Sequence, residues 1–247
     1  MAEGPLEPHP VLTDFYAERG ERVPFVRSLF NRTASHYDAV NRLFSLGSGT
    51  WYRRRCLVRA GLRPGQMVVD VAIGTGLLAR EALAITGDPS RLIGIDLSEG
   101  MLAVAREKLG ISLVQAMAES LPLGDGVTDF VTMGYALRHV SDLAATCREF
   151  HRVLRRGGTL LFLEIGKPTK PFNRALAATY IGRIVPLLSR WSTGHVDVEA
   201  LMRYHWETIE TCVPADIILD ALHASGFKNV TCKVDLDLFR CFTARKA

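Results

Sequence analysis

Short apolar runs alternate along the chain with longer segments in which apolar residues recur at helical spacing. Five of these runs are compact, mostly apolar and bounded by turn residues, which is typical of buried parallel strands. They are residues 67–72, 92–95, 111–114, 130–133 and 159–163. Strands alternating with helices of about 10–15 residues predict an α/β fold with a doubly wound, mostly parallel sheet covered on both faces.

The segment after Ser141 illustrates the helical pattern. Ser141 is a suitable N-cap, and Gly157-Gly158 is expected to end the helix. The apolar stripe of this helix consists of Leu143, Cys147, Phe150 and Leu154. One face is therefore expected to pack on the sheet.

The two ends of the chain depart from this alternation. Residues 1–20 resemble a loose leader, and the apolar spacing of 26–46 predicts one or two short helices before the main domain. We therefore expect an N-terminal part, 1–62, of leader and substrate-side helices, followed by the main domain, 63–247.

A second interruption of the rhythm begins after Lys167. The segment from Pro168 to Trp206 is interpreted as part of an inserted helical cap at about 168–212, interrupted by Pro186. A helix near 214–225 and two closing strands follow. These strands are expected near residues 230–234 and 239–244.

Composition places the chain among ordinary globular proteins. Its 247 residues are 48% hydrophobic and 23% charged, which argues against disorder, a fibrous repeat and a disulfide-rich miniprotein. Five widely spaced cysteines disfavour zinc and disulfide frameworks. No apolar signal segment and no run of about 18 apolar residues occurs, so we expect a cytoplasmic protein, at most peripheral to a membrane.

The net charge of +4 is too small to predict nucleic-acid binding, and no Asn-Pro-Pro-Tyr-type target motif or Lys-rich stripe occurs. Its distribution is uneven, because nine arginines and three acids lie between Glu18 and Ala60. Such a patch suits anionic lipid headgroups or an acidic substrate, and a solvated helix face is the alternative. Arg174 to Trp191, apolar with flanking arginines, likewise fits either a membrane-interface helix or packing on the main domain.

The first strand leads directly into a glycine turn. The sequence Asp70-Val71-Ala72-Ile73-Gly74-Thr75-Gly76-Leu77-Leu78-Ala79 satisfies the dinucleotide pattern G-x-G-x-x-G/A. Asp96, at the end of the second strand, is placed to bind a pair of ribose hydroxyls. A strand-to-helix turn without ligand is the alternative, which the two flanking carboxylates make less favourable.

Asp70 discriminates between two nucleoside ligands. A carboxylate at this strand end would repel the pyrophosphate of a dinucleotide. S-adenosylmethionine instead carries an ammonium and a sulfonium and keeps the ribose for Asp96. The sequence therefore favours S-adenosylmethionine over NAD.

Linked motifs over most of residues 26–170 resemble class I methyltransferases, and more narrowly the ubiquinone and menaquinone biosynthesis C-methyltransferases. The motifs are Phe30-Asn31-Arg32-Thr33-Ala34-Ser35-His36-Tyr37-Asp38-Ala39-Val40-Asn41-Arg42-Leu43-Phe44-Ser45-Leu46-Gly47, Val69 to Gly76, Ile95 to Leu102, Leu137-Arg138-His139-Val140, Arg152-Val153-Leu154 with Gly157-Gly158, and Leu163 to Pro168. The resemblance implies a Rossmann-like sheet of seven strands, with the cofactor at their carboxyl ends and an aromatic substrate under the N-terminal helices and the insertion.

The resemblance also implies roles for individual residues. Tyr37 and Arg138 match substrate-side positions, where Arg138 would help to remove the ring proton directly or through water. Met101 matches a residue near the adenine. With the turn residues and their neighbours, the predicted cofactor-binding residues are Asp70, Ala72, Gly74, Thr75, Gly76, Asp96, Leu97, Met101, Met117 and Ala118.

The chain departs from the family pattern at two positions near the expected site. Met117 stands where the family has an Asp that takes the adenine amino group, so adenine is expected to rest on backbone groups and apolar contacts. His139 replaces the Asn of the family's Arg-Asn pair. A histidine exchanges protons near neutral pH, so His139 is either a general base for a phenolic hydroxyl, favouring O-methylation, or a helix cap or filler of a polar gap.

A third departure lies in the C-terminal part. The segment from Tyr204 to Val213 lacks the family's usual Leu-Ala-Glu-Ser-Ile lid sequence, and Asp235 to Phe239 replaces its closing Gly-Gly strand. The aromatic residues of this region either line a substrate cavity or pack the cap onto the core. They are Tyr180, Trp191, Tyr204, His205 and Trp206. The spacing of His205 and Glu207 does not favour a metal site, and none is expected.

We therefore expect a methyltransferase that uses S-adenosylmethionine and acts on a small electron-rich aromatic, with a carbon of a prenylated benzoquinol or naphthoquinol as the preferred acceptor. Tyr37, Arg138 and His139 are the predicted catalytic residues. The alternatives are an O-, N- or C-methyltransferase of a secondary-metabolite aromatic, a non-catalytic adenosylmethionine-binding subunit and an NAD-linked oxidoreductase. An oligomer is compatible with the sequence, which does not fix the oligomeric state.

Overall fold

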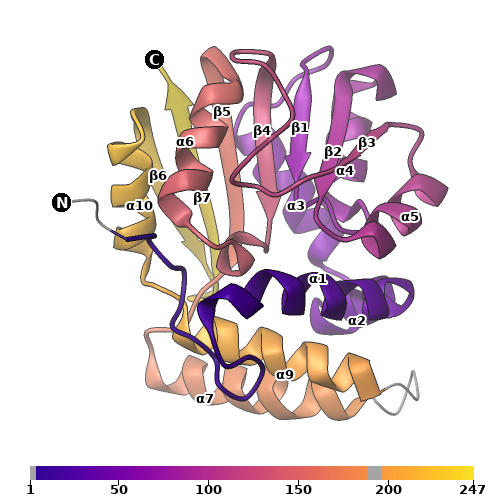
Figure 1. Cartoon of the computed structure of the whole chain (residues 1–247), viewed down its shortest axis with the longest axis vertical. Helices are drawn as coiled ribbons and strands as arrows, with labels where there is room; N and C mark the ends of the chain where they lie inside the picture. Colours follow the sequence, from indigo (N-terminus) through magenta and orange to yellow (C-terminus); the bar gives the residue numbers. More distant parts are fainter. Residues whose placement is uncertain (1–3, 189–195) are drawn as a thin grey trace.

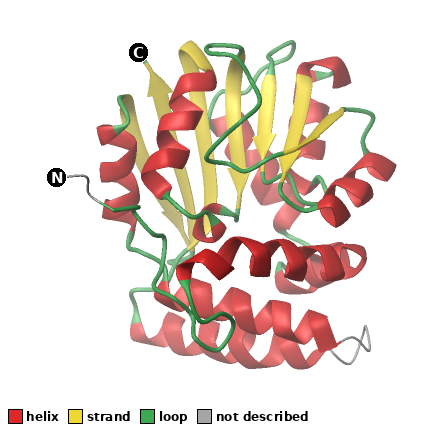
Figure 2. Ribbon diagram, in the orientation of Figure 1, coloured by secondary structure: helices red, strands yellow, loops and turns green. Residues whose placement is uncertain are grey.

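A seven-stranded sheet lies at the centre of the computed structural model, which describes residues 4–188 and 196–247 (Figure 2). Its strand order is β3-β2-β1-β4-β5-β7-β6; β1 to β5 are parallel, and β7 runs antiparallel to β5 and β6. The strands are β1 (Val68–Val71), β2 (Leu92–Asp96), β3 (Ser112–Gln115), β4 (Thr128–Gly134), β5 (Leu154–Ile165), β6 (Phe227–Asp235) and β7 (Phe239–Lys246). The expected mostly parallel sheet is confirmed.

Helices cover both faces of the sheet because alternate strand residues point to opposite sides. Val69 and Val131 pack with α6 (Leu143–Val153) and α10 (Ala215–Ala224) on one face. The residues before them in each strand pack on the other face, against α3 (Gly49–Arg59), α4 (Leu77–Thr86) and α5 (Glu99–Lys108). The sheet is therefore buried on both sides, as its apolar runs predict.

The bounds of α6 differ from the sequence prediction. Asp142, not Ser141, is the N-cap, since its carboxylate accepts hydrogen bonds from Ala144 N at 2.8 Å and Ala145 N at 3.2 Å. The helix ends at Val153 rather than at the Gly-Gly pair, and the buried Leu154 is the first residue of β5. An apolar residue that continues a helical stripe suits a buried strand equally well.

A layer of helices lies across the carboxyl ends of the parallel strands (Figure 1). It contains α1 (Arg22–Thr33), α2 (Tyr37–Phe44), α7 (Pro171–Thr179), a π-helical turn (Tyr180–Ile184) and α9 (Val196–Thr211). The N-terminal helices and the helical insertion are thus confirmed, and the two share a hydrophobic cluster that includes Leu29 and Leu201. The prediction had missed α3, whose consecutive arginines interrupt the apolar spacing.

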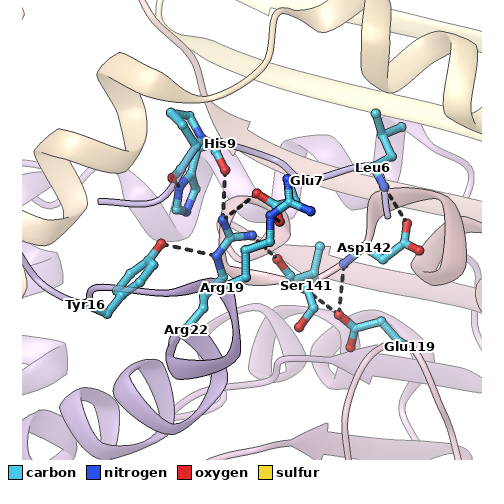
Figure 3. Close-up of polar contacts among 11 residues, drawn as sticks. Leu6, Glu7, His9, Tyr16, Arg19, Arg22, Glu119, Ser141 and Asp142 are labelled. Atoms are coloured by element: carbon cyan, nitrogen blue, oxygen red, sulfur yellow. Dashed lines mark hydrogen bonds and ion pairs between the residues drawn. The ribbon is translucent and has the colours of Figure 1, made fainter. Parts of the chain in front are cut away.

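The N-terminal segment is bound to the main domain, so the expectation of a loose leader is wrong for residues 6–16. Leu6 N donates to Asp142 at 3.3 Å, and Leu12 and Tyr16 are buried. Figure 3 shows the buried Arg22 guanidinium between the Tyr16 hydroxyl, the Glu7 carboxylate and the His9 carbonyl. Asp142, at the start of α6, and Arg22, at the start of α1, thus hold the segment in place through hydrogen bonds, and its apolar side chains are buried.

Two arginines of the basic N-terminal stretch are buried, so the solvated-face interpretation is wrong for them. Arg22 keeps 2% and Arg53 keeps 5% of its surface exposed. Elsewhere the stretch is accessible, as at Arg54 and Arg55. Among the helices of residues 4–188 and 196–247, none has the length and apolar character needed to span a bilayer.

Candidate active site at the strand ends

The order of the strands locates a crevice at the carboxyl ends of β1 and β4. The chain winds from β1 outward to β2 and β3 and then returns to the other side of β1 with β4. Ligands of open α/β sheets bind at such a reversal. Ala72 (φ 52°) and Tyr135 (φ 63°), just after these two strands, both have left-handed backbones. Strained residues of this kind cluster at functional sites.

The glycine turn after β1 is held by the end of β2. Gly74 N donates to Asp96 Oδ2 at 2.8 Å, and Ser98 N donates to Asp96 Oδ1 at 2.8 Å. Burial raises the pKa of Asp96 to about 6, although these donors oppose the shift. The carboxylate that the sequence assigns to a ribose thus also fixes the turn beside it.

Asp70 has one oxygen with a partner and one without. Thr132 Oγ1 donates to Asp70 Oδ1 at 2.5 Å, whereas the buried Asp70 Oδ2 has no hydrogen-bond partner. Burial raises the pKa of Asp70 to about 7, and the nearby Asp96 adds to the effect. An unsatisfied buried carboxylate oxygen is costly, and a bound cation would remove that cost.

Three cavities meet at this edge of the sheet. The α2–α3 cavity, of about 320 Å³, lies among α2, α3 and the turn between β6 and β7. The strand-end cavity, of about 110 Å³, lies between α1 and the ends of β1, β2 and β4, and a smaller glycine-loop cavity lies beside Asp70 and Thr75. Tyr37 and Tyr135 line all three. These two tyrosines therefore stand where the cavities adjoin.

The structure brings nearly all the predicted cofactor-binding residues to two of these cavities. Those on the strand-end cavity are Ala72, Gly74, Asp96, Leu97, Met101, Met117 and Ala118. Asp70 and Thr75 line the glycine-loop cavity, which Ala72 and Gly74 share. Gly76 lines none of the three; at φ 88° it is the N-cap of α4, and a Cβ there would lie 2.5 Å from Leu109 Cδ1.

Arg138 reaches the α2–α3 cavity from a buried position. Its guanidinium donates to the Glu164 carboxylate, and its Nε donates to Thr208 Oγ1 at 3.1 Å. Glu164 also accepts from Ile165 N at 2.9 Å. The cation is therefore fully paired and oriented by β5 and α9.

His139 lies on the strand-end cavity rather than on the α2–α3 cavity. Both of its ring nitrogens are buried without a hydrogen-bond partner. Burial and the Arg138 cation hold the pKa of His139 well below its usual range, so the ring is neutral. The alternative that His139 caps the following helix is wrong, because Asp142 does so.

Of the described aromatic candidates in the cap, three pack against the rest of the protein and one lines a cavity. Tyr204 is fully buried, Trp206 packs against Gly182, and Tyr180 donates to the Leu43 carbonyl at 2.8 Å. Only His205 of the described aromatic candidates lines the α2–α3 cavity. Trp191 lies outside the described residues.

The sequence reasoning did not single out four residues near these cavities, which are Asn31, Asp38, Arg53 and Tyr135. Asn31 accepts from Ser98 Oγ and Gly100 N at 2.6 and 3.0 Å, and Asp38 accepts from Thr75 Oγ1. Asn31 and Asp38 stand in a family-like motif, which was the available signal.

Buried Arg53 lies 5.5 Å from the Tyr135 ring centroid and lines two of the cavities. Nothing distinguishes Arg53 in sequence from the arginines around it.

Comparison with known proteins identifies relatives over most of the chain. Residues 17–235 match the model of the ubiE/COQ5 methyltransferase family. The ubiquinone/menaquinone biosynthesis C-methyltransferase UbiE of Serratia proteamaculans is 34% identical over 242 residues, covering 94% of this chain and 93% of its own. The demethylmenaquinone methyltransferase of Symbiobacterium thermophilum is 37% identical over 175 residues, covering 68% and 70%.

A solved structure has the same fold. It is that of an S-adenosylmethionine-dependent methyltransferase from Thermotoga maritima, described as a possible histamine N-methyltransferase. The two superpose with a TM-score of 0.64 at 18% identity, over 90% of this chain and 99% of the other. The expected class I methyltransferase fold is thereby confirmed.

Proposed function

The chain belongs to the ubiE/COQ5 methyltransferase family, and we propose that it methylates a ring carbon of a prenylated quinol. It is an S-adenosylmethionine-dependent methyltransferase. The proposed acceptor rests on two named relatives, one acting in ubiquinone and menaquinone biosynthesis and one on demethylmenaquinone.

The residues at the strand ends fit S-adenosylmethionine. Its methionine end carries an ammonium and a carboxylate, and the glycine-loop cavity offers Asp70, whose Oδ2 has no hydrogen-bond partner, and the buried Arg53 guanidinium. Asp96 would hold the ribose, and the apolar wall that includes Met117 would contact the adenine. When bound, the cofactor supplies a methyl group already activated on a sulfonium, so positioning by the protein dominates the rate.

The α2–α3 cavity suits the aromatic acceptor. Aromatic and aliphatic side chains make up about half of its lining residues, and the polar ones include Arg53, Arg138, His205 and Asp235. Tyr37 and Tyr135 line this cavity and both cavities of the cofactor side, so these two residues would lie between the acceptor and the cofactor. The observation that carries the proposal is this junction of a large apolar cavity with the two cofactor cavities.

C-methylation requires that the ring carbon lose its proton. Arginine does not act as a base in proteins, and Arg138 is paired with Glu164. We therefore assign Arg138 to orienting the acceptor or a water molecule rather than to direct proton removal. His139, on the cofactor side of the junction, is neutral and can accept a proton, but its lowered pKa makes it a weak base.

Methyl transfer into cell extracts tests the proposal. Purified protein with methyl-labelled S-adenosylmethionine is offered a borohydride-reduced lipid extract and an aqueous methanolic extract of the source cell. Label in a lipid product supports the quinol. Label only in polar aromatics would instead support a secondary-metabolite acceptor, and cofactor binding without label would support a non-catalytic subunit.

We further propose that the mouth of the α2–α3 cavity docks on an anionic membrane surface. Trp51 and Leu236 border this cavity and are 60% and 82% exposed. Asp237 accepts hydrogen bonds from Lys170 N at 2.9 Å and from Asn173 Nδ2 at 3.2 Å, which holds the β6–β7 turn against the start of α7.

Further apolar side chains lie beside this mouth. Phe172, near the start of α7, is 78% exposed, and Leu46, in the turn between α2 and α3, is also exposed. Accessible Arg54 and Arg55 supply positive charge, whereas the nearby Asp235 already pairs with Arg59. Apolar side chains ringed by cations suit the boundary between headgroups and acyl chains.

Sedimentation with vesicles tests this docking. The wild type is expected to bind phosphatidylglycerol vesicles more than phosphatidylcholine vesicles, and W51S/L236S is expected to lose most of that binding. V127S changes an exposed apolar residue before β4, away from the mouth, and serves as the control. Equal binding by all three proteins would refute the docking surface.

A further inference from the structure

Two residues that depart from the family pattern meet in the structure. His139 replaces the Asn of the family's Arg-Asn pair, and His205 lies in the segment from Tyr204 to Val213, which lacks the family's Leu-Ala-Glu-Ser-Ile. Their ring centroids are 5.6 Å apart. His139 lines the strand-end cavity and His205 lines the α2–α3 cavity, so the pair forms part of the wall between cofactor and acceptor.

The protonation of His205 follows from its backbone contact. His205 Nδ1 lies 2.8 Å from the Leu201 carbonyl oxygen. A carbonyl only accepts, so Nδ1 carries the proton and donates, which leaves Nε2 as the unprotonated nitrogen of the neutral ring. Burial, reinforced by the Arg138 cation, lowers the pKa of His205 to about 3. The ring therefore stays neutral at physiological pH.

The His205 ring is held by its neighbours. Phe30 meets it edge to face at 5.9 Å, and His139, itself stacked on Tyr204 at 5.4 Å, meets it edge to face from another side. With α9 holding its backbone, the ring has a fixed direction. A fixed, neutral acceptor on the wall of an apolar cavity is suited to recognising a hydroxyl group.

We infer that His205 Nε2 accepts a hydrogen bond from a hydroxyl of the aromatic acceptor and thereby selects the reduced ring over the oxidised ring. This inference rests on the proposed function. A quinol hydroxyl donates to the nitrogen, whereas a quinone carbonyl brings a second lone pair against it, and an unpaired buried polar group is strongly disfavoured. Donation also raises the electron density of the ring, which favours attack by its carbon.

Binding of the two redox forms tests the inference without turnover. A short-chain prenyl naphthoquinone and its quinol are titrated anaerobically into protein saturated with S-adenosylhomocysteine. The wild type is expected to bind the quinol at least tenfold more tightly than the quinone. H205L, which replaces the ring with an apolar side chain, and H205F, which keeps a ring without the nitrogen, are expected to bring that ratio close to one.

The ratio of quinol affinity to quinone affinity is measured for each variant, so an equal loss of affinity for both forms leaves it unchanged. H223L makes the same change at an exposed histidine on α10 and is expected to keep the wild-type ratio. A ratio that survives in both H205L and H205F would overturn the role of His205. Failure of the wild type to bind or methylate either form would instead overturn the proposed acceptor.

Discussion

Asp38 of α2 accepts a hydrogen bond from Thr75 Oγ1 in the glycine turn, and its second carboxylate oxygen lies 2.5 Å from Lys108 Nζ of α5. At the start of α5, Asn31 of α1 accepts hydrogen bonds from Ser98 and Gly100. The N-terminal helices are thus fastened over the residues that we propose bind the cofactor. We expect their docking and cofactor affinity to be linked.

The Asp38 contact gives the first prediction. D38A removes a hydrogen bond to the glycine turn and an ion pair to Lys108 of α5, together about 1–2 kcal/mol, so S-adenosylhomocysteine should bind roughly tenfold more weakly. Isothermal titration calorimetry measures this, with D14A, a change at an exposed aspartate, as control. An unchanged affinity in D38A would show that docking of the N-terminal helices and cofactor affinity are not linked.

The close approach of α1 and α5 at Gly100 gives the second prediction. A Cβ on Gly100 would lie 2.8 Å from the Asn31 carbonyl oxygen, so G100A must push the two backbones apart. We expect a loss of about 1–3 kcal/mol in the free energy of unfolding, measured in urea. In G110A, just after the end of α5, the new methyl group meets nothing within 4 Å. Equal stability of the two variants would contradict the contact.

The pKa of Asp70, raised to about 7, makes cofactor binding depend on pH. The cationic ligand binds the ionised carboxylate, so at pH below about 7 binding must first displace a proton. Affinity should therefore rise up to about tenfold per pH unit between pH 5.5 and 7 and then level off. D70N should bind more weakly and lose this component of the slope. Calorimetry in buffers of different ionisation enthalpy should detect the released proton in the wild type only.

The buried Arg138–Glu164 pair predicts a large effect on stability. E164Q leaves a buried guanidinium without its counter-charge, which typically costs about 3–5 kcal/mol. D197N breaks the exposed pair with Arg32 and should cost less than about 1 kcal/mol. Urea unfolding of both variants compares the two pairs. Similar losses would mean that the Arg138 cation has another source of stabilisation.

Sequence reasoning predicted the sheet and most residues of the two cavities on the proposed cofactor side, because both depend on local signals. Buried parallel strands read as apolar runs, and the turn after Asp70 needs glycine at Gly74, where φ is 58°. Arg53 and Tyr135 escaped because their positions depend on how α3 and β4 pack in three dimensions. The contact between His139 and His205 could not be predicted for the same reason, since the two residues lie 66 positions apart in the chain.

The fate of the ring hydrogen tests the central claim most directly. The purified protein is given S-adenosylmethionine and a prenyl naphthoquinol carrying deuterium at its unsubstituted quinol-ring carbon, and the product is analysed by mass spectrometry and NMR. Methylation at carbon predicts a product that has gained a methyl group on that carbon and lost the deuterium to solvent. A product that retains the deuterium and carries its new methyl group on oxygen would contradict the account.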